Sequence, residues 1–192
     1  TIYLNTYSKF PIQFVLKSII KNPTDKETKT LQDLTNITIS CIIAPFVEEA
    51  QKYFVSRVAA FKPSTLDANA ILAYALCGGV VFGAFENYVF MSTIYSTAGD
   101  QMNPKDRWYR YAGLVGHMGY AVVSGCRLAE WRFLGKHRGM MAVIWPSMLL
   151  HGLFNFFCSG GGFSSILRKI YGDDPVFEKW DYFVVAEYVM DI

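Results

Sequence analysis

The chain has 192 residues, of which 52% are hydrophobic and only 18% are charged, whereas soluble domains carry about 25% charged residues. This composition favours a membrane protein over a soluble globule. The formal net charge of +2 gives no indication of a nucleic-acid partner.

Residues 1–35 are mixed in character. The stretch from Tyr3 to Ile20 is amphipathic and aromatic, and the stretch from Lys21 to Asp33 is polar. We expect an interfacial segment followed by a loop. Because the chain starts at Thr1 and a new apolar run begins at Tyr182, we interpret it as a fragment of a longer protein.

Four long apolar segments follow, each long enough for the roughly 20 residues that cross hydrocarbon. In lipid the backbone must satisfy its own hydrogen bonds, so we expect each segment to be a helix. The segments cover residues 36–61, 67–95, 111–131 and 139–159. The predicted fold is an all-α, polytopic transmembrane bundle with at least four spanning helices. Residues 161–192 are interpreted as a loop and the start of a further transmembrane helix.

The cysteines do not form a metal site. Cys41, Cys77, Cys126 and Cys158 each stand alone in an apolar run, without a C-x-x-C pair, so thiolate ligation is not expected. Basic residues flank the apolar segments on both sides, and positive-inside counting leaves the membrane orientation open.

Each apolar segment carries polar residues, although a charge near the centre of a membrane helix costs about 2.5–3.5 kcal/mol. In chain order they are Glu48, Glu49, Lys52, Glu86, Asn87, His117, His151 and Asn155. If the segments alternate in direction, the carboxylates and imidazoles lie roughly 10 to 18 Å below one membrane face, at 1.5 Å per residue. We therefore expect these groups to form one site.

The residue types in this set indicate hydrolysis. Glu48 and Lys52 are four residues apart, as are His151 and Asn155, so each pair shares a helix face. A buried carboxylate can act as a general base near neutral pH. Two histidines and a glutamate can hold zinc and leave one position for water. Alternatively, a glutamate alone activates water while His and Asn donors hold the oxyanion.

With these motifs, the chain resembles the PrsW family of intramembrane proteases, within the superfamily of the CAAX-prenyl endopeptidases. The resemblance covers roughly residues 41–157. The matching motifs are E-E-x-x-K at Glu48, Glu49 and Lys52, F-x-x-x-E at Phe82 and Glu86 followed by Asn87, a lone His117, and H-x-x-x-N at His151 and Asn155. The CAAX enzymes carry E-E-x-x-x-R and F-x-x-x-H, so Lys52 and Glu86 favour PrsW.

The resemblance implies an intramembrane endopeptidase that acts on membrane-protein substrates in lipid, with residues 36–160 as its protease core. It implies an integral, multi-pass membrane protein. The expected catalytic residues are Glu48, Glu49, Glu86, His117, His151 and Asn155, with Lys52 and Asn87 in support. If the enzyme is a metallopeptidase, we expect zinc as the cofactor, held by Glu86, His117 and His151. Which of Glu48 and Glu49 is the base stays open.

Two other functions are compatible with the same polar residues. One is a non-catalytic membrane scaffold that keeps the fold. The other is a proton- or ion-coupled transporter that uses the buried carboxylates. Transporters often contain internal repeats, and no repeat relates the first two apolar segments to the last two, which disfavours this alternative.

Overall fold

The computed structural model describes residues 25–98, 104–136 and 139–158. All the elements within these ranges are helices, which confirms the all-α prediction for this part of the chain. The expected interfacial segment at residues 3–20 and the tail at residues 161–192 lie outside the described residues.

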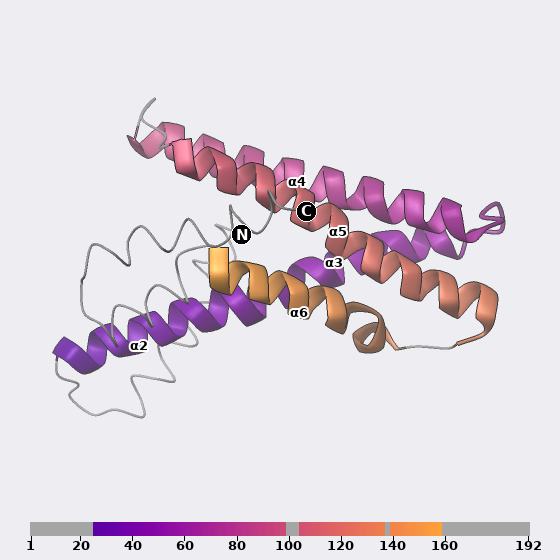
Figure 1. The fold of residues 1–192 in the computed structure, drawn as a ribbon, viewed down its shortest axis with the longest axis horizontal. Coiled ribbons are helices and arrows are strands. Elements are labelled where there is room, and N and C mark those ends of the chain that lie inside the picture. The colour runs from indigo at the N-terminus through magenta and orange to yellow at the C-terminus, as the bar shows by residue number, and fades with distance from the viewer. Residues whose placement is uncertain (1–24, 99–103, 137–138, 159–192) are drawn as a thin grey trace, which may run out of the picture. The chain divides into compact units, whose positions relative to one another are not determined.

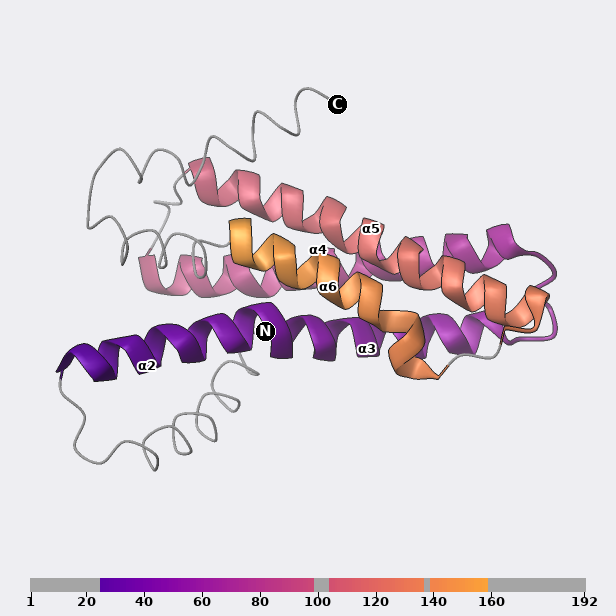
Figure 2. The same cartoon turned by 60° about the horizontal axis from the view of Figure 1, so that its bottom comes forward.

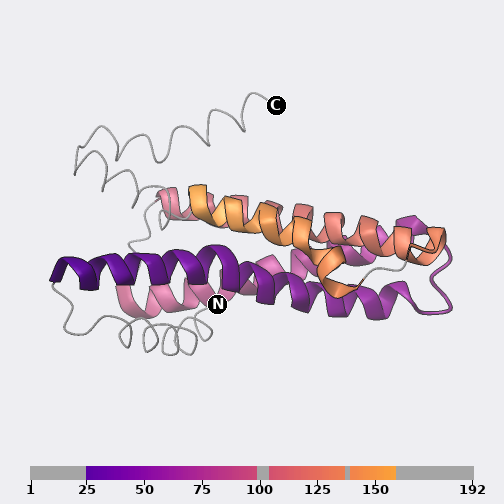
Figure 3. The same ribbon diagram turned by 90° about the horizontal axis from the view of Figure 1, so that it is seen from below.

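The first helical stretch is longer than the sequence predicted. Helix α2 (Asp25–Thr38), the π-helical segment η1 (Ile39–Ile43) and helix α3 (Ala44–Ala60) follow one another without a loop (Figure 3). The predicted loop at Lys21 to Asp33 is therefore wrong from Asp25 onwards. Half of the polar residues there are Lys, Glu or Gln, which are strong helix formers, and neither Gly nor Pro interrupts the stretch.

The π-helical segment has a local cause in Pro45. Proline has no N–H, so it cannot bond to a carbonyl of the preceding turn, and η1 lies in that turn. The Ala44 N–H reaches back five residues to Ile39 O. The Ser40 hydroxyl donates to Asn36 O at 2.7 Å. The chain thus enters α3 with the Ser40 and Cys41 carbonyls released from the regular α-helical pattern.

The other three apolar segments are also helices, as predicted. They form α4 (Ala68–Ala98), α5 (Pro104–Leu134) and α6 (Met140–Cys158) (Figure 1). Asp67 caps α4, because its Oδ1 accepts the Ala70 N–H at 2.7 Å. Gly135 follows the end of α5 with a φ of +65°, the left-handed conformation that commonly ends a helix.

Three helical stretches are long and apolar enough to cross a membrane: Thr30–Ala60, Ala68–Ser92 and Met140–Phe157. Helix α5 does not meet this criterion, so the predicted minimum of four spanning helices is not confirmed. The reason lies in its composition. Its middle contains His117 and Ser124, and Arg110 and Arg127 lie nearer its ends.

The described residues divide into two compact units. One consists of residues 45–151, and the other includes residues 25–44 and 152–158. The apolar core of the first unit combines residues from all four of its helices: Tyr53, Ala60, Ile71, Leu128, Val143 and Ile144. Burial of these side chains holds the four helices α3, α4, α5 and α6 together at the end of the unit where α4 begins and α5 ends.

Helices α4 and α5 pack closely against each other (Figures 1 and 2). A Cβ atom on Gly79 would lie 2.6 Å from His117 O, and one on Gly83 would lie 2.8 Å from Leu114 Cδ1. Both distances are too short for a side chain, so glycine permits this approach. The contact sets the height of His117 relative to α4.

Arg132, at the end of α5, contacts the connection between α3 and α4. Its guanidinium donates to Ala60 O, to Lys62 O at 2.9 Å and to Thr65 O at 2.5 Å. The three carbonyls belong to the end of α3 and to the loop after it, where a helix leaves its last carbonyls without partners of its own. Lys62 O also accepts the Thr65 N–H at 3.1 Å. Arg132 therefore ties the end of α5 to the α3–α4 connection.

Candidate active site

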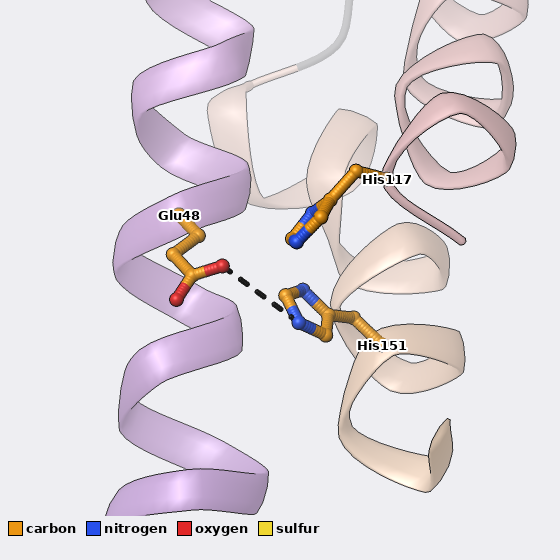
Figure 4. A group of neighbouring side chains, drawn as sticks. All are labelled: Glu48, His117 and His151. Carbon is orange, nitrogen blue, oxygen red and sulfur yellow. Dashed lines mark ion pairs between the residues drawn. The ribbon is translucent and has the colours of Figure 1, made fainter. Parts of the chain in front are cut away.

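Three helices of the unit 45–151 bring two imidazoles and a carboxylate together. Glu48 lies on α3, His117 on α5 and His151 on α6, and their side chains point toward one another (Figure 4). One ligand atom from each lies within 4.8 Å of the others. The three residues are only 4%, 3% and 4% exposed, respectively. The site is therefore built inside the helix bundle and away from solvent.

His151 contacts both adjacent glutamates of α3. Its Nδ1 lies 3.0 Å from Glu49 Oε1. Its Nε2 lies 3.7 Å from Glu48 Oε2, the contact that is dashed in Figure 4. Because a carboxylate accepts a hydrogen bond, we assign the imidazole proton to Nδ1, from which it is donated to Glu49. The lone pair on Nε2 then faces Glu48.

His117 is held from two sides as well. Its Nε2 lies 2.7 Å from Glu86 Oε2, and its Nδ1 lies 3.2 Å from Lys52 Nζ. An ammonium group can only donate, so Nδ1 is the acceptor and Nε2–H donates to Glu86. The lone pair of His117 therefore faces Lys52.

Lys52 and Glu49 form a fully buried ion pair. Lys52 Nζ donates to Glu49 Oε1, and their side chains are 3% and 0% exposed. The same Glu49 oxygen also accepts the hydrogen bond from His151 Nδ1–H. The other oxygen, Oε2, is buried and receives no hydrogen bond from any described residue. Glu49 thus has one oxygen held by donors and one that can still accept a proton.

The Glu86 side of the site is partly exposed. Arg110 lies 3.6 Å from Glu86, and the two side chains are 27% and 22% exposed. Asn87 donates from Nδ2 to Arg110 O at 3.1 Å, and the Arg110 guanidinium lies 3.7 Å from the centre of the Phe90 ring. These contacts join α4 to α5 and orient Glu86 toward His117.

Most of the residues expected from the sequence meet here. Glu48, Glu49, Lys52, Glu86, His117 and His151 form a continuous set of ion pairs and hydrogen bonds. The three-residue donor group differs from the predicted one, because it contains Glu48 where we expected Glu86. Glu86 contacts the nitrogen of His117 that carries the proton.

Asn155 was predicted to be catalytic and belongs to the second compact unit. Its Nδ2 donates to Ser40 O at 2.8 Å, so it binds a carbonyl released by the π-helical segment. Next to it, a Cβ atom on Gly152 would overlap Cys41 O. The catalytic role of Asn155 stays a prediction. The hydrogen bond to Ser40 O connects α6 to the π-helical segment.

Tyr120, which is 8% exposed, also belongs to the site and was not predicted from the sequence. Its ring stacks on His151, with ring centres 4.9 Å apart and planes 15° apart. Tyr120 lies three residues after His117 on the same helix, and this spacing places both side chains on one face. The spacing could therefore have identified Tyr120 as a neighbour of the site. Gly116 leaves room for this ring, because a Cβ there would lie 2.9 Å from the Tyr120 hydroxyl.

The charges in the site favour a further cation. Three carboxylates, those of Glu48, Glu49 and Glu86, are accompanied by the side chains of Lys52 and Arg110. Both imidazoles point their lone pairs away from the carboxylates to which they donate. Burial disfavours the charged form of a carboxyl group, and a cation beside Glu48 would favour its ionised form.

Comparison with known proteins gives one family. The family model described as "PrsW family intramembrane metalloprotease" matches residues 4–171. This range includes every residue of the site. No curated protein and no solved structure matches the chain.

Proposed function

We propose that the chain hydrolyses peptide bonds of membrane-protein substrates at the Glu48–His117–His151 group. It belongs to the PrsW family of intramembrane metalloproteases. The main support is that ligand atoms of a carboxylate and two imidazoles lie within 4.8 Å of one another in a buried site. Glu48 and His151 lie on stretches that are long and apolar enough to cross a membrane, so the substrate bond has to reach a buried, apolar environment.

The metal ion implied by the family fits these three side chains. Catalytic zinc sites commonly have three protein ligands and an open position for water. A ligating histidine normally donates its other N–H to a carboxylate or carbonyl. Here the His151 partner is Glu49 at 3.0 Å and the His117 partner is Glu86 at 2.7 Å. Glu48, His117 and His151 would hold the ion, and bound zinc would supply a Lewis acid and an acidified water.

Glu49 is the proposed general base. Its Oε1 is fixed by Lys52 and His151, and its Oε2 is buried without a hydrogen bond from the described residues. Oε2 accepts a proton as a water oxygen attacks the carbonyl carbon of the substrate. Glu49 then returns this proton to the amide nitrogen as the C–N bond breaks. Lys52, whose ammonium is buried beside Glu49, stabilises the carboxylate before the transfer.

A metal-free route uses the same base. The Lys52 ammonium supplies positive charge and a hydrogen-bond donor for the oxyanion. The buried Lys52 beside His117 supports this second mechanism. The two routes differ in whether removal of bound metal stops cleavage.

The family assignment favours a peptidase over the scaffold and the transporter that the sequence left open. We also propose that the protein is multi-pass, with α5 as a fourth spanning helix beside the three apolar ones. Helix α5 has 31 residues, about 45 Å at 1.5 Å per residue, which exceeds the roughly 30 Å of the hydrocarbon core.

Cleavage of a transmembrane peptide carrying a fluorophore and a quencher tests the function. The full-length protein in liposomes is compared with Glu49→Gln and His151→Ala, and Glu130→Gln serves as the control. Glu130 is 38% exposed and pairs with Lys136 outside the site. We expect Glu49→Gln to lower kcat by roughly 10²- to 10⁴-fold, as loss of a general base does, and His151→Ala to abolish cleavage.

Equal cleavage by Glu49→Gln and the wild type would contradict the assigned base. Equal cleavage by all variants would show that the measured hydrolysis does not come from this site. The Glu130→Gln variant should keep the wild-type rate, because it removes a carboxylate without touching the cluster.

A further inference from the structure

The Lys52 side chain is the most unusual cation in the described part of the chain. It is 4% exposed and pairs with Glu49 on its own helix. Its Nζ also lies 5.2 Å from the centre of the Phe82 ring and 5.6 Å from that of Tyr120. A carboxylate and two aromatic faces thus surround the ammonium group, an arrangement that suits a cation in a dry site.

The contact with His117 gives Lys52 a second role. Lys52 Nζ lies 3.2 Å from His117 Nδ1, while the opposite nitrogen, Nε2, donates to Glu86. The only lone pair of the neutral imidazole is therefore occupied by the lysine. A metal ion can bind His117 only through a lone pair.

We propose that Lys52 is a built-in competitor for the metal, whose ammonium occupies the His117 lone pair and thereby limits metal affinity at the Glu48–His117–His151 group. This inference rests on the proposed function. Two effects produce it, since metal binding must displace the lysine from His117 and must also bring a divalent cation close to a fixed positive charge. The lysine in turn keeps the buried Glu49 carboxylate paired with a cation when no metal is present.

A purely structural lysine gives a different expectation. Its removal would destabilise the fold, because Glu49 would be left as a buried carboxylate without its cation. It would not tighten metal binding. The affinity for the metal alone therefore separates the two roles.

The test measures zinc affinity by competition with a chromophoric chelator, using the purified full-length protein in detergent. Lys52→Met removes the charge and keeps an unbranched side chain that is one atom shorter. Lys52→Arg keeps a cation in the same place. Lys62→Met is the matched control, because Lys62 is exposed in the α3–α4 loop. His151→Ala reports whether the bound zinc occupies the proposed group.

Because Lys52→Met strands Glu49, the double variant Lys52→Met with Glu49→Gln is measured in parallel. It removes both charges of the pair, and the glutamine oxygen can still accept the His151 proton. Absorption of bound cobalt(II) reports, independently of activity, whether each variant builds the same coordination group.

We expect Lys52→Met to bind zinc at least roughly tenfold more tightly than the wild type, because a like charge is removed from a low-dielectric site. The double variant should exceed Glu49→Gln alone by the same factor, because Glu49→Gln by itself removes the carboxylate that orients His151. Lys52→Arg and Lys62→Met should bind as the wild type does. The role of Lys52 would be overturned, and the proposed function left standing, if Lys52→Met bound zinc no more tightly than the wild type and the double variant no more tightly than Glu49→Gln, with zinc still lost in His151→Ala. Zinc binding that is unaffected by His151→Ala would overturn both.

Discussion

At the scale of single residues, the site assigns different tasks to carboxylates that look alike in the sequence. Glu48 faces the lone pair of His151, whereas Glu49 and Glu86 each accept a hydrogen bond from one imidazole. The E-E-x-x-K and F-x-x-x-E motifs alone could not show this. Adjacent residues on a helix point about 100° apart, so only the positions of the neighbouring helices decide which carboxylate meets which nitrogen.

The Glu86→Gln variant separates a metal ligand from a carboxylate that orients one. Glu86 contacts the protonated nitrogen of His117, so we expect Glu86→Gln to weaken zinc affinity roughly 10- to 100-fold, as loss of an outer carboxylate does. Cleavage at saturating zinc should stay close to the wild-type rate. Zinc titration of the cleavage rate measures both quantities. A total loss of bound zinc would instead make Glu86 a ligand, as the sequence first suggested.

At the scale of the helices, the sequence predicted well where most helices lie along the chain, but it did not predict which side chains meet between helices. The apolar runs located α4, α5 and α6 within a few residues of their observed bounds, except that α5 begins seven residues earlier than expected. The helical state of residues 25–35 was missed, because charge was interpreted as a loop. Tyr120 was missed for another reason: its stacking on His151 depends on contact between α5 and α6, which no local pattern records.

Helix α4 depends on Gly79 for its distance from α5. A Cβ at this position would lie 2.6 Å from His117 O, and a backbone atom cannot move aside as a flexible side chain can. We expect Gly79→Ala to destabilise the protein by about 1–3 kcal/mol, as overpacking does, and to lower cleavage by displacing His117. Thermal unfolding in detergent and the peptide assay measure the two effects.

The neighbouring Gly78 provides the control for this substitution. A Cβ on Gly78 meets only Ser56 Oγ, at 4.0 Å, which is an ordinary contact distance. Gly78→Ala should therefore unfold and cleave as the wild type does. If both alanine variants behave alike, the packing of α4 against His117 is not what positions the imidazole.

Helix α6 is held to the π-helical segment by Asn155. Its Nδ2 donates to Ser40 O at 2.8 Å, and Asn155→Ala leaves that released carbonyl without this donor. We expect a loss of about 0.6–1.7 kcal/mol in unfolding free energy, the range measured for hydrogen bonds between membrane helices. Denaturant unfolding in detergent measures it, with Ser92→Ala as the control, because Ser92 is exposed and donates to Val89 O in its own helix.

The result also decides between two roles for Asn155. If the residue acts structurally, Asn155→Ala should keep most of its cleavage rate at temperatures where it is fully folded. A large loss of kcat with unchanged stability would support the catalytic role that the H-x-x-x-N motif predicts.

At the scale of the whole molecule, the chain is an integral membrane protein of the PrsW family, and three of its helical stretches are long and apolar enough to span the bilayer. The fourth helix of the site, α5, was predicted to span on its apolar character, which proved too weak to meet the same criterion. Its contacts supply another argument. Arg132 near its end binds carbonyls of the α3–α4 connection, which places these two ends together.

This contact predicts the topology. If α5 spans the membrane, the α3–α4 loop and the α5–α6 loop lie on the same face. Single cysteines at Lys62 and Lys136, in a chain whose four natural cysteines are replaced, should then react with an impermeant maleimide from the same side of sealed vesicles. Both positions are exposed. Labelling from opposite sides would show that α5 does not cross.

The central claim is that a metal held by Glu48, His117 and His151 serves peptide hydrolysis inside the membrane. The most direct measurement is cleavage of the transmembrane peptide by one protein preparation before metal removal, after removal verified by elemental analysis, and after zinc is restored. We predict that cleavage is lost with the metal, returns with zinc in the wild type, and does not return in His151→Ala. Full cleavage by the verified metal-free protein would contradict the claim and favour water activation by Glu49 alone.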